Sequence, residues 1–232
     1  MTRHDPKLAN GLSISGAVRD EVAHDLSVQD ALARDYVNLS ALADMLVPKV
    51  GERTGTKVNR ESVITALKRL RGTYNPVTQQ TGRVIAESVV NVRTHVSKVS
   101  VEKTRRALRS LGAMLSNNQE DFIQVSESLS ALTLIFDQRL HKRIRKELAG
   151  AEILEEGDDY AAMTVQSPEA IITTPGCLIS FYNQLSRRHV NIEDTVSCYT
   201  DTIIVVKMKD VGKAFEALTE LINEERREME EE

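Results

Sequence analysis

The 232-residue chain is poor in aromatic side chains, at 4% with no Trp, and it contains only two cysteines. A platform on which bases or sugars stack needs more aromatic rings, so none is expected. Cys177 and Cys198 lie far apart and form no CxxC pair, which argues against a zinc site and a disulfide framework. Apolar runs such as Thr202–Val206 are too short to cross a bilayer, and residues 1–16 lack the apolar core of a signal peptide. We therefore expect a soluble, cytoplasmic protein without a membrane partner.

Motifs of known catalytic sites are also missing. No GxSxG, phosphate-binding loop or GxGxxG occurs. The five histidines are scattered, and none is paired at i, i+4 with another His, a Cys or a suitably placed carboxylate. Cys177 is expected at the beginning of a helix, where a thiol becomes more acidic, but no histidine partner is evident. We expect no enzyme, no catalytic residue, no metal and no cofactor.

The net charge of −4 conceals a gradient along the chain. Residues 1–75 have 11 Lys and Arg against 9 Asp and Glu, and residues 76–150 have 12 against 7. Residues 151–232 have 7 against 18 and end in a Glu-rich tail, Glu224–Glu232. A basic front and an acidic back favour different partners for the two halves, although an ordinary solvated surface with an acidic tail has the same pattern.

Residues 1–75 are predicted to form a small helical domain. A helix over Ser13–Leu26 begins near Ser15, and Ser27 caps a short second helix. Asn38 caps a third, Leu39–Val47, which is expected to end at Pro48. Asn59 caps a fourth, Arg60–Arg71, which Gly72 and Pro76 end. Residues 76–88 are interpreted as a linker.

The fourth helix has one apolar and one polar face. Val63, Leu67 and Leu70 form the buried stripe, and Glu61, Thr65, Lys68 and Arg69 lie opposite at about 100° per residue. The segment YVNLSALADMLVPKVGERTGTKVNRESVITALKRLR (residues 36–71) is similar to helix-turn-helix segments of archaeal regulators. The resemblance implies that Thr65, Lys68 and Arg69 face DNA and that Arg60 and Arg71 flank phosphates. Glu61 and the small net charge of this domain fit a protein partner as well.

Two α+β units are expected after the linker, over residues 89–157 and 158–232. In the first, a period-two strand around Val90–Val96 is followed by a helix over Val101–Leu115, strands Phe122–Ser128 and Ala131–Phe136, and a helix ending at Leu148. Gly157–Asp159 is interpreted as a hairpin turn between strands 152–156 and 160–165.

The same order recurs in the second unit. A strand over 161–166 precedes a helix over 176–188, strands 190–197 and 202–209, and a helix that begins after Asp210. Both units are therefore predicted to be ferredoxin-like βαββαβ folds. No fourth strand follows the last helix of the second unit. The open sheet edge that this leaves favours a homodimer.

The segment TTPGCLISFYNQLSRRHVNIEDTVSCYTDTIIVVKMKDVGKAFEALTELI resembles an ACT domain. The resemblance implies a regulatory module that binds an amino acid at an interface between domains, against the Gly-containing loop and the beginning of the second strand. It assigns ligand contacts to five residues: Thr174, Gly176, Cys177, Asn191 and Ile192. A Gly that opens a helix permits close approach, and free N–H groups there attract a carboxylate. The first unit has no Gly at the matching place, and many ACT-like units serve only oligomerisation.

Basic residues are concentrated in the two helices of the first unit. Arg139, Lys142 and Arg143, with Arg145 and Lys146, occupy the segment QRLHKRIRKE. Arg105, Arg106 and Arg109 are on the preceding helix, and helices on one face of a sheet are neighbours. Together they indicate a surface for RNA, DNA phosphate or an acidic protein. A solvated helix face and pairing with the acidic part of the chain are the alternatives.

Three functions follow from these features. The first is an amino-acid-sensing ACT homodimer, coupled to a nucleic-acid-binding head that regulates transcription. The second is an allosteric subunit that confers amino-acid feedback on a biosynthetic enzyme. The third is an RNA- or ribosome-associated factor that uses the basic helices 101–115 and 138–148.

Overall fold

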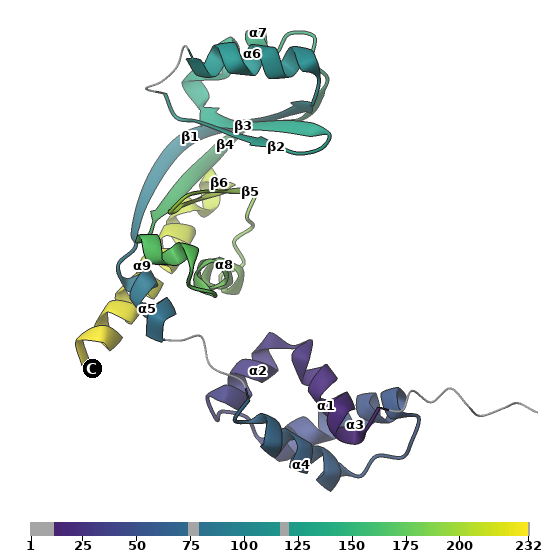
Figure 1. Cartoon of the computed structure of the whole chain (residues 1–232). Helices are drawn as coiled ribbons and strands as arrows, with labels where there is room; N and C mark the ends of the chain where they lie inside the picture. Colours follow the sequence, from purple (N-terminus) through teal and green to yellow (C-terminus); the bar gives the residue numbers. More distant parts are fainter. Residues whose placement is uncertain (1–11, 74–78, 117–120, 232) are drawn as a thin grey trace, which may run out of the picture. The chain divides into compact units, whose positions relative to one another are not determined.

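The computed structural model describes residues 12–73, 79–116 and 121–231, and the chain divides into two compact units after Thr78. The N-terminal one, the helical unit, contains only helices among its described elements. The C-terminal one, the sheet-containing unit, contains the strands, arranged in one six-stranded sheet, and the remaining helices (Figure 1). The expected division into a helical part and an α+β part is thus observed.

The helical unit contains α1 (Ile14–Ala23), α2 (Leu26–Ala33), α3 (Leu39–Thr54) and α4 (Arg60–Leu70). Asn38 and Asn59 accept backbone hydrogen bonds at the beginnings of α3 and α4, as expected. The other two caps differ from the prediction. Ser13 rather than Ser15 caps α1, and Asp25 rather than Ser27 caps α2.

Helix α3 does not end at Pro48 as expected but continues to Thr54, where Gly55 follows with φ +65°. Proline removes one backbone N–H from a helix and usually interrupts it. Here Leu46, Val50 and Thr54 fall at i, i+4 and i+8 and are all buried. Packing of this stripe in the helical core outweighs the lost hydrogen bond, which the local sequence does not reveal.

The sheet consists of β1 (Val89–Glu102), β2 (Ile123–Glu127), β3 (Ala131–Asp137), β4 (Ile153–Gln166), β5 (Asp194–Cys198) and β6 (Asp201–Lys207). Its order is β2-β3-β1-β4-β6-β5, with every pair antiparallel. The long strands β1 and β4 pair with each other along their length, and each serves both ferredoxin-like units.

The first ferredoxin-like unit uses the second half of β1, then α6 (Arg105–Ser116), β2, β3, α7 (His141–Glu147) and the first half of β4. The second unit uses the second half of β4, then α8 (Cys177–Arg187), β5, β6 and α9 (Val211–Glu231). The fourth strand of the second unit is the first half of β1, where Val89–Arg93 pair with Ala162–Gln166. The prediction that this strand is missing is therefore wrong, because it precedes the unit in the sequence.

The predicted hairpin at Gly157–Asp159 is also wrong, because β4 runs through these residues. Asp159 has φ +65°, and His95 in β1 has φ +56°. The pairing of β1 with β4 shifts register between Arg93 and Lys98. Both strands are thus irregular at the same level, where each passes from one half of the sheet to the other. Residues typical of turns here mark a bend within a strand.

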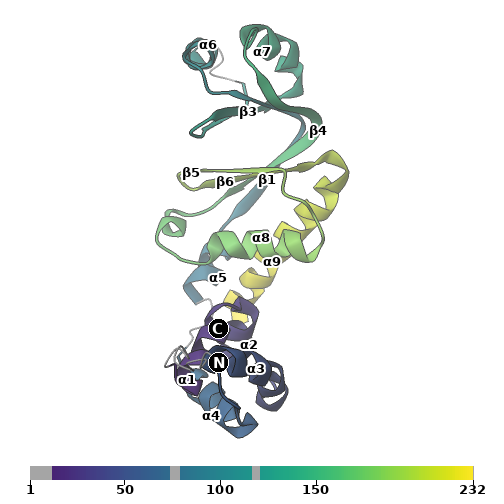
Figure 2. The same cartoon turned by 90° about the vertical axis from the view of Figure 1, so that its right-hand side faces the viewer.

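Helices lie outside and the two halves of the sheet face each other (Figure 2). Helices α6 and α7 cover the half that contains β2 and β3, and α8 and α9 cover the half that contains β5 and β6. An apolar cluster fills the space between the halves, with Val96, Ile135, Tyr160, Ile203 and Val205 as members. The sheet-containing unit therefore has two helix layers around two layers of strands.

The expected linker 76–88 contains a helix, α5 (Gln79–Ala86), that belongs to the sheet-containing unit. It packs against α8 and α9. Val84, Ile85 and Ala86 are buried there, and Ile85 joins the core that lies under α8 and α9. Three buried apolar side chains in eight residues distinguish this segment from a solvated linker.

Candidate functional site

The loop before α8 carries three of the predicted ligand contacts. Thr174 is buried, and its hydroxyl donates to the Ala170 carbonyl at 2.8 Å. Gly176 has φ +94°, a left-handed conformation that favours glycine, and it begins α8 without a side-chain cap. Cys177 follows at 1% exposure. No side chain therefore caps the N–H groups of the first turn of α8, the end of a helix that favours negative charge.

The matching position in the first unit is filled by the protein itself. Before α6, the Thr104 hydroxyl accepts a hydrogen bond from the Ala107 N–H at 3.1 Å. The beginning of α6 thus has an ordinary side-chain cap. The beginnings of α6 and α8 thus differ in whether a side chain caps them.

Helix α5 lies on the loop that opens α8. The Thr81 hydroxyl donates to the Pro175 carbonyl at 3.0 Å, and Thr81 is 1% exposed. Arg226 of α9 donates from Nε to the Ala86 carbonyl at 2.7 Å and from Nη2 to the Ser88 carbonyl at 3.1 Å, so it caps the other end of α5. The sequence interpretation missed both residues because it took residues 76–88 as a linker.

The other two predicted ligand contacts lie elsewhere. Asn191 and Ile192 line an open pocket of about 670 Å³ with Tyr182, Ser186 and His189 from the end of α8 and the turn after it. The Asn191 side-chain amide donates to Glu193 Oε1 at 3.0 Å. Since α8 has eleven residues and Asn191 and Ile192 follow its end, about 16 Å of helix separates these two residues from Gly176. One copy of the chain does not bring the five predicted residues together.

Cys177 differs from the expectation for a thiol at a helix N-terminus. Burial raises its pKa above the ordinary value, against a smaller opposing effect of a backbone hydrogen bond. The thiol is therefore less acidic than a free one. Sequence position alone suggested the opposite, because it did not show that the side chain points into the core.

The residues predicted to contact nucleic acid on α4 fall into two groups. Arg60 pairs with Asp44, and this pair lowers the pKa of Asp44 and raises that of Arg60. Arg71 pairs with Asp35. Thr65, Lys68 and Arg69 are exposed, and their side chains make no hydrogen bond or ion pair with the described residues. Intramolecular pairs therefore reduce the cationic side chains that α4 offers to a partner.

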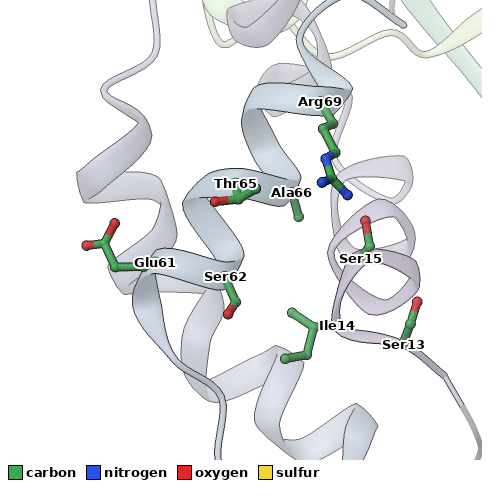
Figure 3. A pocket seen from close by; sticks show the side chains of 8 residues that line it. All are labelled: Ser13, Ile14, Ser15, Glu61, Ser62, Thr65, Ala66 and Arg69. Atoms are coloured by element: carbon green, nitrogen blue, oxygen red, sulfur yellow. The ribbon is translucent and has the colours of Figure 1, made fainter.

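A groove between α1 and α4 includes two of the free residues (Figure 3). It has a volume of about 490 Å³ and is lined by Ser13, Ile14, Ser15, Glu61, Ser62, Thr65, Ala66 and Arg69. Figure 3 shows Arg69 reaching from α4 towards the N-terminal turn of α1, where Ser15 lies. Within residues 12–73, the side chains of Ser15, Ser62 and Thr65 have no hydrogen-bond partner. The groove offers hydroxyls and one cation beside an apolar floor.

The basic residues predicted on the first unit also differ in their surroundings. Arg139 pairs with Asp121 at 2.8 Å and Asp137 at 3.4 Å. Lys142 and Arg143 are exposed on α7 without such a partner in the described part of the chain. Of these three residues, only Lys142 and Arg143 have charges that no described carboxylate neutralises.

The sheet-containing unit has a buried cation that the sequence interpretation did not identify. Lys98 of β1 is 5% exposed, and its Nζ lies 3.0 Å from Glu155 Oε1 and 3.7 Å from Asp194 Oδ2. It also donates to the Glu193 carbonyl at 3.3 Å. Lys98 thereby ties the first half of the sheet to the beginning of β5, next to Asn191. Its place in a period-two strand gave no sign of these partners.

No group of three or more His, Cys, Asp or Glu side chains among the described residues has the arrangement of a metal site. None of the helices in residues 12–73, 79–116 and 121–231 combines the length and the apolar composition that a membrane span requires.

Comparison with known proteins identifies one family. The sequence profile of the ACT domain matches residues 155–220, whereas a search of curated protein sequences finds no match. Solved structures give matches of 10–15% identity. Aspartate kinase from Clostridium acetobutylicum has 15% identity and a TM-score of 0.48 over 57% of this chain. The chain spans only 34% of the length of that kinase.

Two further structures resemble the chain over most of their own length. The regulatory subunit of aspartate kinase from Thermus thermophilus has 10% identity and a TM-score of 0.48, covering 57% of this chain and 95% of that one. A protein of unknown function from Vibrio cholerae has 15% identity and a TM-score of 0.44, covering 62% and 97%. The segment that the ACT profile matches, residues 155–220, includes α8, β5 and β6 and therefore both Gly176 and Asn191. Residues 155–220 thus match the ACT domain, and this match fits an amino-acid-sensing regulatory role.

Proposed function

We propose that this protein is an amino-acid-responsive regulator in which the second ferredoxin-like unit binds the ligand and the helical unit acts on a partner macromolecule. The observation that carries the proposal is the ACT domain at residues 155–220, whose helix α8 begins at an uncapped, left-handed glycine. The amino-acid carboxylate meets the free N–H groups of the first turn of α8. Thr174, Gly176 and Cys177 form the wall of this site.

Asn191 and Ile192 complete the site from a second copy of the chain. They lie about 16 Å of helix away from Gly176 in the same copy, so they reach the same ligand only across an interface. A two-fold arrangement of two chains brings the loop of one copy to the pocket of the other and creates two equivalent sites. The homodimer is thus part of the proposal.

Helix α5 connects this site to the helical unit. It contacts the Pro175 carbonyl through Thr81 and lies just after the helical unit in the sequence. A ligand that moves the loop 174–176 changes the packing of α5. It shifts the protein between two states only as far as it binds them with different affinity. Two sites and one connecting helix are the minimum for such coupling.

The helical unit acts on nucleic acid or on an enzyme. Exposed Thr65, Lys68 and Arg69 on α4, after the turn that follows α3, favour DNA and transcription regulation. The pairing of Arg60 with Asp44 and of Arg71 with Asp35 leaves few free cations and favours a biosynthetic enzyme as the alternative partner. Operator-sequence binding that disappears in Lys68→Ala/Arg69→Ala supports DNA, and co-purification of an enzyme that persists in this variant supports the alternative.

The ligand claim is tested by thermal unfolding with each of the twenty amino acids. A ligand at about 100 times its Kd stabilises the native state by about 2.7 kcal/mol, which raises Tm by several degrees. Asn191→Ala should abolish the shift, whereas Asn223→Ala, at an exposed site of α9 outside this pocket, should retain it. Light scattering checks that two chains are present. Absence of a shift with all twenty compounds contradicts amino-acid sensing.

A further inference from the structure

Six exposed cations form one layer on the outer helices of the first ferredoxin-like unit. We call it the basic helix layer; its members are Arg105, Arg106, Arg109, Lys142, Arg143 and Lys146. None of the six lies within ion-pair distance of a carboxylate among the described residues. The one acidic residue on these two helices is Glu147. The layer is therefore strongly positive and has no partner within the described chain.

Other cations of the same unit behave differently. Five of them each pair with a carboxylate: Arg93, Lys98, Lys103 and Arg139, which lie on the strands or beside them, and Arg145 of α7, which pairs with Glu156 of β4. Carboxylates thus neutralise the cations on and beside the strands and Arg145 of α7, but none of the six cations of the basic helix layer. An ordinary solvated surface mixes charges of both signs, as the sheet side of this unit does.

The two helices present these cations on one side. On α6, Ala107, Leu111 and Met114 are buried, so Arg105 and Arg109 lie on the opposite face at about 100° per residue. On α7, buried Ile144 places Lys142 and Lys146 on the outer face. The two helices pack side by side (Figures 1 and 2). A Cβ on Gly150, just after α7, would come within 2.8 Å of the Arg106 guanidinium, so this arginine spans the gap.

We propose that the basic helix layer binds the phosphate backbone of double-stranded nucleic acid. Neither helix has Phe, Tyr or Trp, so it offers no rings on which the bases of a single strand could stack. A duplex presents closely spaced phosphates on a stiff surface, which suits cations fixed on two helices. Such contacts position a duplex but do not read its sequence. The site is independent of the ligand site and of the exposed face of α4.

The test is fluorescence anisotropy of the full chain with short duplexes of scrambled sequence, one of DNA and one of RNA. Polyglutamate serves as the acidic polypeptide. Wild-type protein should bind at least one duplex in a salt-dependent manner. If about four phosphates are contacted, affinity should fall about 100-fold between about 50 and about 200 mM salt. Whichever duplex binds more tightly identifies the source of the phosphates.

Two matched variants locate the binding. Arg105→Gln/Arg109→Gln/Lys142→Gln/Arg143→Gln removes four layer cations and should weaken binding by at least about tenfold, with a smaller dependence on salt. Arg187→Gln/Lys209→Gln/Lys213→Gln/Arg227→Gln removes four exposed cations of the second unit and should leave affinity within about twofold of wild type. Substituting Lys for the arginines of the first variant should keep most of the affinity, and circular dichroism checks that all variants fold.

Results of three kinds overturn the proposal. In the first, neither duplex binds at low salt. In the second, the layer variant binds as tightly as wild type, or Lys68→Gln/Arg69→Gln removes all binding and so assigns it to α4. In the third, polyglutamate binds more tightly than either duplex, and the layer variant no longer binds it. This result identifies an acidic protein as the partner.

Discussion

The two ferredoxin-like units have the same strand order but differ in how the chain supplies them. The first is built from consecutive residues, whereas the second takes its fourth strand from the beginning of β1. Thr104 caps the helix of the first, whereas Gly176 leaves the helix of the second open. The outer helices of the first have free cations, and those of the second are covered in part by α5. The same architecture thus has a basic helix surface in one unit and an uncapped helix that begins at a left-handed glycine in the other.

Core substitutions test whether these two units are energetically separate. Phe136 in β3 and Phe181 in α8 are both fully buried, each in the core of its own unit. Replacing either with Ala should lower the free energy of unfolding by about 3–5 kcal/mol. Because β1 and β4 run through both units, each variant should destabilise both in a single calorimetric transition. Two transitions, of which each variant shifts only one, would show that the shared strands do not couple the units.

Removing the cap of α5 tests a feature that only the second unit has. Arg226→Ala deletes the hydrogen bonds to the Ala86 and Ser88 carbonyls and should cost about 1–3 kcal/mol, less the part that solvent recovers at this exposed side chain. The loss should be local, with faster amide exchange in α5 and little change in α6. Arg226→Lys keeps the charge but not the two-pronged geometry, so its free energy of unfolding should lie between those of the wild type and Arg226→Ala. Equal loss of protection in α6 would contradict a local role.

The beginnings of α6 and α8 allow a smaller, paired test. Thr104→Ala removes a side-chain cap and should cost about 1 kcal/mol. Gly176→Ala places a Cβ on a residue with φ +94° and should cost about 1–2 kcal/mol. Urea unfolding at constant m-value measures both. If Gly176→Ala is neutral, the left-handed loop is not required by the fold.

The sequence was sufficient for most of the elements but not for how the units share them. Alternation of Val90, Val92 and Val96 predicted a strand, and Asn38 and Asn59 predicted two helix beginnings. Nothing local indicated that β1 continues to Glu102 and serves two units, since pairing with Ala162–Gln166 is a long-range choice. Likewise the turn residues Gly157–Asp159 have the same composition in a hairpin as in a bent strand.

The candidate sites show the same division between local and long-range information. The glycine that opens α8 was identifiable from sequence, because only its own backbone conformation was at issue. The partners of Arg60 and Arg71 were not, because Asp44 and Asp35 lie on other elements. Thr81 and Arg226 remained hidden for the same reason.

The smallest expected effect on stability comes from Cys177, the first residue of α8. Its side chain is buried, whereas that of Arg105, the first residue of α6, is exposed. Since burial raises the pKa of the Cys177 thiol, the unfolded chain loses this proton at a lower pH than the folded one. The stability that Cys177 contributes is therefore present below the ordinary thiol pKa of 9.0 and falls as pH rises above it. Cys177→Ser should reduce this loss of stability at alkaline pH, measured by urea unfolding across the pH range.

Thiol labelling with a chromogenic disulfide reports the same contrast directly. Cys198 is exposed and should react quickly in the native state, whereas Cys177, at 1% exposure, should react only as the protein opens. Cys198→Ser should remove the fast phase and leave the slow one. Arg226→Ala, which loosens α5 over the loop before Cys177, should accelerate the slow phase, whereas Thr104→Ala at the start of α6 should affect it less. Rapid labelling of Cys177 in native protein would mean that the start of α8 is as open to solvent as the start of α6.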